Sequence, residues 1–309
     1  MKYFTKTLIL LLLVSTGLMA SGTHNVQILT APNADGKITT KTIESVFEKA
    51  GFFINDNRDM LPPFIKNFKT VDYDVYSLFT IFKTKEVVKL GKKYPKIGLF
   101  TPMSMSIYTR KNSKEISVSS LTVEAMAKIM DIPKENPDLL SYVKSVQDTL
   151  LLALPNAKKE IVSYSMKKDT GKLVSSFSKK IDEDFDIDDF QELEFEPTLP
   201  ENDFINAGFN DVNYYFEEAE MENYSFYTVH SICNISVIYI VSQKHPEAGA
   251  FAPCSLYMYN KKGSKTMEIG FPSVYNWIAS LAIEDKESID ILMSAQTKME
   301  DILKKLTSK

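Results

Sequence analysis

Cys233 and Cys254 carry the most reactive side chains of this 309-residue chain, and they are its only cysteines. They stand 21 positions apart. Two such thiols can form a structural disulfide, remain as unpaired structural residues, or act as a redox or ligand-binding pair. A disulfide that closes a loop of this length would stabilise the fold by about 3 kcal/mol. Because no CxxC motif is present, a thioredoxin-type mechanism has no support, and the three alternatives stay open.

The other side chains give little support for catalysis or metal binding. His230 lies three positions before Cys233 in a predicted strand, and the two-residue period of a strand places the two side chains on opposite faces. That arrangement disfavours a metal ion shared by the two residues. The chain also lacks the GxSxG, HExxH and phosphate-loop motifs. We therefore predict no catalytic residue, no metal ion and no cofactor.

An internal repeat indicates how the chain is organised. Residues 245–255, HPEAGAFAPCS, resemble residues 94–104, YPKIGLFTPMS, which lie 151 positions earlier. Such self-similarity predicts two related structural units before any propensity is considered. Both copies carry a glycine and a proline at matching positions, Gly249 and Pro253 in the second copy. We interpret these shared residues as requirements of the fold.

The two copies differ at the positions that could do chemistry. Phe82 occupies the position equivalent to Cys233, and Met103 occupies the position equivalent to Cys254. Both thiols therefore belong to the second copy, and we expect the first copy to act as its structural partner.

A second match extends the repeat toward the amino terminus. Residues 47–52 resemble residues 204–209, now 157 positions apart, whereas Tyr76 and Tyr227 are again separated by 151. The difference predicts about six extra residues in the first copy, which we place near residues 61–63.

Periodicity predicts the elements of each copy. Apolar residues recur three and four positions apart over residues 40–50, as on one face of a helix. Residues 72–82 are rich in aromatic and β-branched residues, which favours a strand. Each copy ends in a predicted amphipathic helix, at 139–154 and at 289–306. We therefore expect an α+β fold made of two tandem copies, each a small, mostly antiparallel sheet with packed helices.

These elements divide the chain into domains. We assign residues 25–158 to a first, diverged repeat domain, 159–200 to a connector, and 201–309 to a second repeat domain. The connector is predicted to begin with a hairpin that pairs residues 160–165 with residues 173–178.

The rest of the connector is acidic. Residues 182–196 hold nine acidic side chains and no basic one, with aromatic residues interleaved among them. Repulsion between like charges favours an extended, solvated segment, and the aromatic residues suggest that it docks on one of the copies. A calcium loop would require glycine at its sixth position, where this chain has Ile187, so the pattern disfavours calcium.

The amino-terminal residues 1–20 resemble a secretory signal peptide. Lys2 and Lys6 precede an apolar run at residues 8–19, and small residues follow it. That run is too short to span a bilayer, which needs about 20 residues. We expect a periplasmic or secreted protein that does not span the membrane after cleavage. The formal net charge of −4 argues against a nucleic-acid partner.

The second copy resembles a known family. Residues 231–234, SICN, followed by a helix and by residues 245–259, HPEAGAFAPCSLYMY, are similar to the domain of unknown function 302 (DUF302) family. The resemblance covers residues 204–306, and residues 25–154 look like a diverged second example. It implies an α+β architecture similar to the TATA-binding protein, in which the two copies pair as a pseudo-dimer within one chain. The family has no established activity, so no function follows from it.

Our leading hypothesis is an exported, non-catalytic binding or accessory protein of the bacterial cell envelope. Its partner would be a small ligand or an envelope protein, and its pocket would lie between the copies or beside Cys254. The residues expected around that pocket are Gly249, Pro253, Cys254 and His230. One alternative is a redox or sulfur-handling protein that uses Cys254 with Cys233, and another is a purely structural interaction protein.

Overall fold

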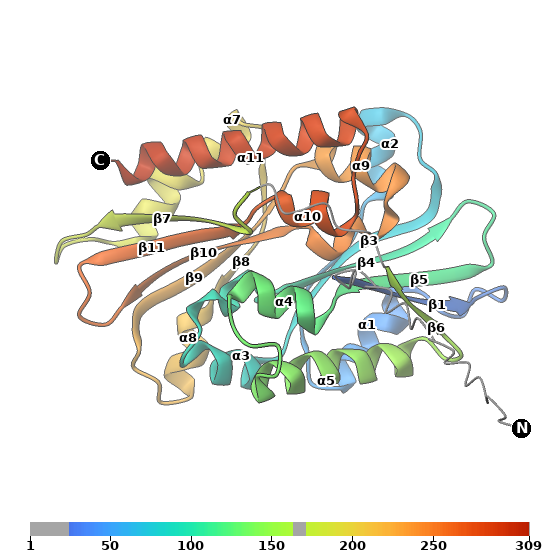
Figure 1. Cartoon of the computed structure of the whole chain (residues 1–309), viewed down its shortest axis with the longest axis horizontal. Helices are drawn as coiled ribbons and strands as arrows, with labels where there is room; N and C mark the ends of the chain where they lie inside the picture. Colours follow the sequence, from blue (N-terminus) through green and yellow to red (C-terminus); the bar gives the residue numbers. More distant parts are fainter. Residues whose placement is uncertain (1–24, 163–170, 309) are drawn as a thin grey trace, which may run out of the picture.

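Two antiparallel β-sheets with packed helices make up the protein, which is an α+β, two-domain structure, as the sequence predicted (Figure 1). A computed structural model describes residues 25–162 and 171–308. We call residues 26–162 the first half and residues 174–307 the second half. The predicted signal peptide, residues 1–20, lies outside the described residues. In the part of the chain that is described, no helix is both long and apolar enough to cross a membrane.

The first half contains a six-stranded sheet in the order β2-β3-β4-β5-β1-β6. Its strands are β1 (Val26–Pro32), β2 (Phe53–Asp59), β3 (Tyr73–Phe82), β4 (Met103–Arg110), β5 (Glu115–Leu121) and β6 (Lys158–Val162). Its helices are α1 (Thr40–Lys49), α2 (Leu61–Phe68), α3 (Thr84–Gly91), α4 (Val123–Met130) and α5 (Pro137–Ala153), with a 3₁₀ helix, η1 (Pro95–Phe100).

The second half contains a five-stranded sheet in the order β7-β11-β10-β9-β8. Its strands are β7 (Val174–Lys180), β8 (Ile205–Asp211), β9 (Tyr224–Cys233), β10 (Cys254–Lys261) and β11 (Thr266–Pro272). Its helices are α8 (Val212–Glu218), α9 (Ile235–Lys244), α10 (Tyr275–Ser280) and α11 (Lys286–Thr307), with a 3₁₀ helix, η3 (Pro246–Phe251).

The two sheets have the same topology. Strands β8-β9-β10-β11-β7 of the second sheet follow one another as β2-β3-β4-β5-β1 do in the first. The register also agrees, because Ser106 lies opposite Ser119 and Tyr257 lies opposite Gly270, each residue shifted by 151. The predicted separation of 151 positions thus holds across these strands.

The predicted match between residues 47–52 and 204–209 was wrong. Phe53 of β2 pairs with Phe82, and Ile205 of β8 pairs with Cys233. Ile205 therefore corresponds to Phe53, 152 positions away, and the six extra residues predicted near 61–63 are not needed. The two similar segments have different structures, because Gly51 follows helix α1 at a φ of 79° whereas Gly208 lies inside strand β8.

The predicted hairpin between residues 160–165 and 173–178 was also wrong. Strand β6 pairs with β1 in the first sheet, whereas β7 pairs with β11 in the second. The second sheet therefore begins at β7, ahead of the predicted boundary at residue 201. Alternating residues identify a strand, but its partner depends on which sheet edge it reaches.

The acidic segment is helical instead of extended. It forms α6 (Ile187–Asp189), the π-helix η2 (Phe190–Phe195) and α7 (Thr198–Glu201). Phe190 and Phe195 are buried in a cluster with Met267 of β11, while Leu193 stays 70% exposed. The aromatic residues therefore dock on the second sheet, and their burial offsets the repulsion among the neighbouring acids.

The two halves exchange their 3₁₀ helices. Helix η3 of the second half packs on β4 and β5, and η1 of the first half packs on β10 and β11. Tyr76 Oη donates a hydrogen bond to the carbonyl oxygen of Pro246 at 3.1 Å, and Tyr227 Oη donates to that of Pro95. These two bonds are related by the same shift of 151 positions.

The exchanged helices approach the sheets closely, and this explains the shared glycines. A Cβ atom at Gly249 would lie 2.5 Å from Cβ of Ser106 and 3.1 Å from its Cα. At Gly98 a Cβ would collide with the Tyr227 hydroxyl, which accepts a hydrogen bond from the Gly98 N–H at 2.9 Å. Larger residues at either position would push the two halves apart.

Replacing Tyr227 by Phe tests this interface. Tyr227→Phe leaves the buried Gly98 N–H without its acceptor, and we expect the free energy of unfolding to fall by about 1–3 kcal/mol. Urea denaturation followed by far-UV circular dichroism measures the change. Tyr214→Phe is the matched control, because Tyr214 is 54% exposed. Equal stability of the two variants would contradict the role assigned to the Tyr227 hydroxyl.

Candidate functional site

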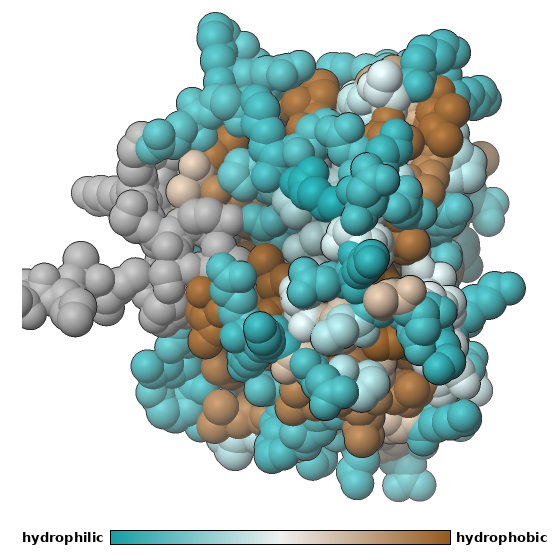
Figure 2. Space-filling view, turned by 90° about the vertical axis from the view of Figure 1, so that its right-hand side faces the viewer, coloured by the Kyte–Doolittle hydropathy of each residue, from teal (hydrophilic) through white to brown (hydrophobic). Residues whose placement is uncertain are grey.

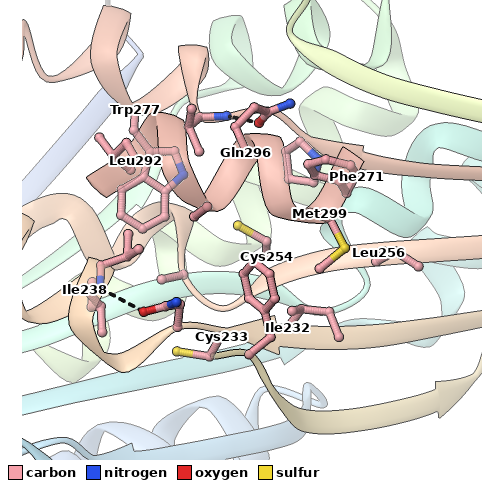
Figure 3. A pocket seen from close by; sticks show the side chains of 17 residues that line it. Ile232, Cys233, Ile238, Cys254, Leu256, Phe271, Trp277, Leu292, Gln296 and Met299 are labelled. Atoms are coloured by element: carbon pink, nitrogen blue, oxygen red, sulfur yellow. Dashed lines mark hydrogen bonds between the residues drawn. The ribbon is translucent and has the colours of Figure 1, made fainter. Parts of the chain in front are cut away.

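An apolar pocket lies in the second half, between the sheet and helices α9, α10 and α11. We call it the α11 pocket. Its cavity volume is about 60 Å³, and the empty space reaches about 590 Å³ when the part that opens to solvent is counted. Figure 3 shows Cys254 in the middle of this pocket, with Trp277 and Leu292 on one side and Phe271 and Met299 on the other. Its lining residues are Phe204, Ile232, Cys233, Asn234, Val237, Ile238, Ala252, Cys254, Leu256, Phe271, Pro272, Val274, Trp277, Leu292, Ala295, Gln296 and Met299.

The two cysteines are free thiols, so the predicted alternative of a structural disulfide is not realised. Cys254 lies directly opposite Ile232 in the pairing of β10 with β9. Cys233, one residue after Ile232, therefore points its side chain to the other face of the sheet. Cys233 borders both the α11 pocket and a second cavity, between the halves, that Arg58 and Pro253 also line. The pleat of the sheet separates the two sulfur atoms.

Both thiols are protonated at neutral pH. Burial raises the pKa of Cys233 to about 12, with the charge of Arg58 opposing the shift. Burial, reinforced by the neighbouring Cys233, also raises the pKa of Cys254 to about 12. A thiol must ionise to act as a nucleophile. The local environment therefore suits packing or ligand contact better than redox chemistry.

The polar groups of the α11 pocket are few. Gln296 is fully used, because its Oε1 accepts from the Val274 N–H at 3.0 Å and its Nε2 donates to Ser175 Oγ at 2.7 Å and to Glu300 Oε1 at 2.8 Å. The Cys254 thiol donates to the carbonyl oxygen of Phe251 at 3.4 Å. Trp277 differs, because its buried indole N–H has no oxygen or nitrogen partner among the described residues and meets only the Cys254 sulfur, a weak acceptor.

His230, one of the residues expected at the pocket, lies in a separate buried site. Its Nε2 lies 2.8 Å from Gln191 Oε1, and its Nδ1 lies 3.1 Å from Asn206 Nδ2. An amide nitrogen can only donate, so Nδ1 accepts, Nε2 carries the proton and the ring is neutral. Burial lowers the pKa of His230 to about 4. Glu196, whose Oε1 is 3.7 Å from Nδ1, is the acidic group nearest to the ring.

The other expected residues divide between the two cavities and the interface. Cys254 lines the α11 pocket, and Pro253, which follows a cis peptide bond, lines the cavity between the halves. Gly249 lies against Ser106 in the interface instead of at a pocket. In residues 25–162 and 171–308, no group of three His, Cys, Asp or Glu side chains is placed to hold a metal ion.

Sequence analysis did not identify Trp277, Leu292 and Met299 as pocket residues. Trp277 corresponds by the shift of 151 to Met126, a fully buried residue of α4, so the repeat predicts its burial and not a pocket. Leu292 and Met299 lie seven positions apart on helix α11, which is the spacing of a buried helix face. That signal predicts burial but does not distinguish a filled core from a pocket.

Comparison with known proteins assigns no activity. No family model matches the chain, and no curated protein matches it. The structure of an uncharacterized conserved protein DUF302 from Bacillus stearothermophilus is similar to part of it, at 18% sequence identity and a TM-score of 0.37. The similarity covers 44% of this chain and 99% of that chain.

The state of the thiols predicts their reactivity. At about pH 7.5, iodoacetamide should modify the native protein at least about a hundredfold more slowly than it modifies an unstructured cysteine peptide, because a pKa near 12 leaves little thiolate. Mass spectrometry measures the extent of modification. In denaturant without reductant, both cysteines should react fully. Failure to react there would indicate a disulfide, and rapid reaction in the native state would indicate an activated thiol.

The buried histidine predicts a pH dependence of stability. Because the folded protein lowers the pKa of His230 from 6.5 to about 4, the stabilising neutral form dominates above the unfolded value and is lost as the pH falls toward 4. Between about pH 7 and pH 5, this histidine should reduce the free energy of unfolding by about 2 kcal/mol.

The matched variant is His230→Gln, which cannot bind a proton in this range. Urea denaturation at several pH values should show a smaller loss of stability for the variant than for the natural protein. Parallel pH profiles for the two proteins would refute the assignment.

Proposed function

We propose that this protein is a non-catalytic binding protein that holds a small, apolar ligand in the α11 pocket. The observation that carries the proposal is the lining of the pocket, which consists of apolar side chains with few polar groups. Ligand pockets in proteins commonly combine apolar walls with a small number of polar contacts.

The chemistry of the lining supports binding over a reaction. Cys233 and Cys254 are the residues of the pocket that could act as nucleophiles, and burial keeps both protonated. The lining contains no Asp, Glu, His, Lys or Arg side chain that could transfer a proton. The redox alternative would require at least one activated thiolate, and the electrostatics around these sulfur atoms favour the opposite.

A comparison between the halves also supports a ligand role for the second. Met103 stands at the position of Cys254 and is 1% exposed, and Phe82 stands at the position of Cys233 and is fully buried. These larger side chains occupy space that the smaller cysteines leave open. We infer that the first half acts as the structural partner, and that both halves descend from one DUF302-like domain.

We propose that the protein acts in the cell envelope after export. The support is the amino-terminal pattern of two lysines and a short apolar run. Docking of a large protein partner has less support on the face drawn in Figure 2, where the apolar residues form separate groups among hydrophilic ones. A small ligand is therefore the partner that we favour.

Filling the α11 pocket tests the proposed function. Cys254→Met introduces the larger side chain that the first half has at this position, and we expect it to weaken binding of the uncharged dye N-phenylnaphthylamine at least about tenfold. The reason is steric, because the added atoms occupy the centre of the pocket. Dye fluorescence during titration of the mature protein measures the affinity.

Met103→Leu is the matched control, because it changes the equivalent position of the first half with little change in volume. It should bind the dye like the natural protein. Equal affinity of Cys254→Met and Met103→Leu, or no dye binding by the natural protein, would refute the proposed function.

A further inference from the structure

We propose that the ligand of the α11 pocket carries a neutral carbonyl group on an apolar body, and that the indole N–H of Trp277 donates a hydrogen bond to the carbonyl oxygen. The proposal rests on the proposed function, because it concerns the same pocket. It adds the chemical class of the ligand and the residue that would select it.

The first observation is the unsatisfied donor. Trp277 is 3% exposed, and its Nε1 has no oxygen or nitrogen partner in the described chain. The neighbouring Cys254 sulfur, which the indole approaches closely enough to oppose the rise in the pKa of that thiol, is only a weak acceptor. The indole nitrogen lies on the side of the ring that faces Cys254, inside the pocket (Figure 3). A buried donor without a partner costs about 1–3 kcal/mol, and such groups are rare in native proteins. An acceptor supplied by a ligand would remove this cost.

A second donor lines the same pocket. The side-chain oxygen of Asn234 caps helix α9, accepting from the N–H groups of Ser236 at 3.0 Å and Val237 at 3.2 Å. This fixes the amide plane. Asn234 is half-buried and borders the pocket, so its Nδ2 is available to water or to a ligand. Two available donors call for an acceptor, and a carbonyl oxygen has two lone pairs.

The remaining polar groups do not call for a donor on the ligand. Gln296 uses its oxygen and its nitrogen in hydrogen bonds to protein atoms. The pocket thus presents one buried donor without a strong acceptor and a half-buried amide donor at its edge, whereas its side-chain amide acceptors are occupied. An alcohol or an amine would bring a hydrogen that lacks a good acceptor, which favours a ketone or an ester.

The charge of the lining indicates a neutral ligand. The pocket wall has no Lys, Arg or His side chain to pair with a carboxylate. Moving an anion from water into such a site would cost far more than two neutral hydrogen bonds return. A neutral carbonyl meets the same donors without that cost.

The test compares two molecules of nearly equal shape. One is methyl hexyl ketone, and the other is the alkene in which a methylene group replaces its carbonyl oxygen. Each displaces N-phenylnaphthylamine from the mature protein, and the ketone should do so at a concentration at least about tenfold lower. In Trp277→Phe, which lacks the N–H, the difference should shrink to less than about threefold. The control Met126→Leu changes the equivalent position of the first half, outside the pocket, and should retain the preference.

A second measurement does not depend on any variant. Trp277 is the single tryptophan of the chain, so its indole N–H gives one resonance in a proton–nitrogen correlation spectrum. The ketone should shift that resonance downfield, as hydrogen bonding does, and the alkene should shift it much less.

The outcomes separate the two proposals. Displacement of the dye by both molecules at equal concentration, or an unchanged indole resonance with bound ketone, overturns the carbonyl assignment and leaves the binding function standing. A preference for the ketone that persists in Trp277→Phe also overturns the role of the indole. If neither molecule displaces the dye from the pocket, the carbonyl proposal fails, and if the dye does not bind, the proposed function fails with it.

Discussion

The exchange of 3₁₀ helices between the two halves is the constraint on which the rest of the structure depends. Helix η3 covers strands of the first sheet, and η1 covers strands of the second. Each sheet must bury an apolar face against another layer, and here each half supplies part of that layer for the other. The hydroxyls of Tyr76 and Tyr227 donate hydrogen bonds to the backbone of these helices. These bonds fix the position of each helix on the sheet, which apolar packing alone would not do. Gly98 and Gly249 permit the close approach.

This shared scaffold leaves the opposite face of each sheet free to diverge. In the first half, that region contains Met103 and Met126 in a packed core. In the second half, Cys254 and Trp277 take their places beside the long helix α11. The cysteine is smaller than methionine and leaves space, whereas the indole adds a wall with one polar atom. A pocket can therefore arise in one half without any change to the interface that holds both together.

Part of this arrangement could be predicted from residues, and part could not. The α+β class, helix α1 and the shift of 151 positions followed from periodicity and the repeated Gly and Pro residues. The predicted match between residues 47–52 and 204–209 was wrong, because six similar residues can form the end of a helix in one place and a strand in another. The hairpin failed because β6 and β7 join different sheets. The relation of the two thiols depended on one residue of register, since Ile232, not Cys233, lies opposite Cys254.

By itself, the sequence indicated the α+β class, the shift of 151 positions between two units, and the place of both thiols in the second unit. These features depend on local spacing, which a chain carries in its order of residues. Only the tertiary structure decided that Cys233 borders two cavities while Cys254 lines one, that His230 is buried beneath the acidic segment, and that the Trp277 indole N–H faces the pocket beside a weak sulfur acceptor. Those facts depend on which strand edges meet and which helix covers them, because contacts between distant residues exist only once the layers have packed.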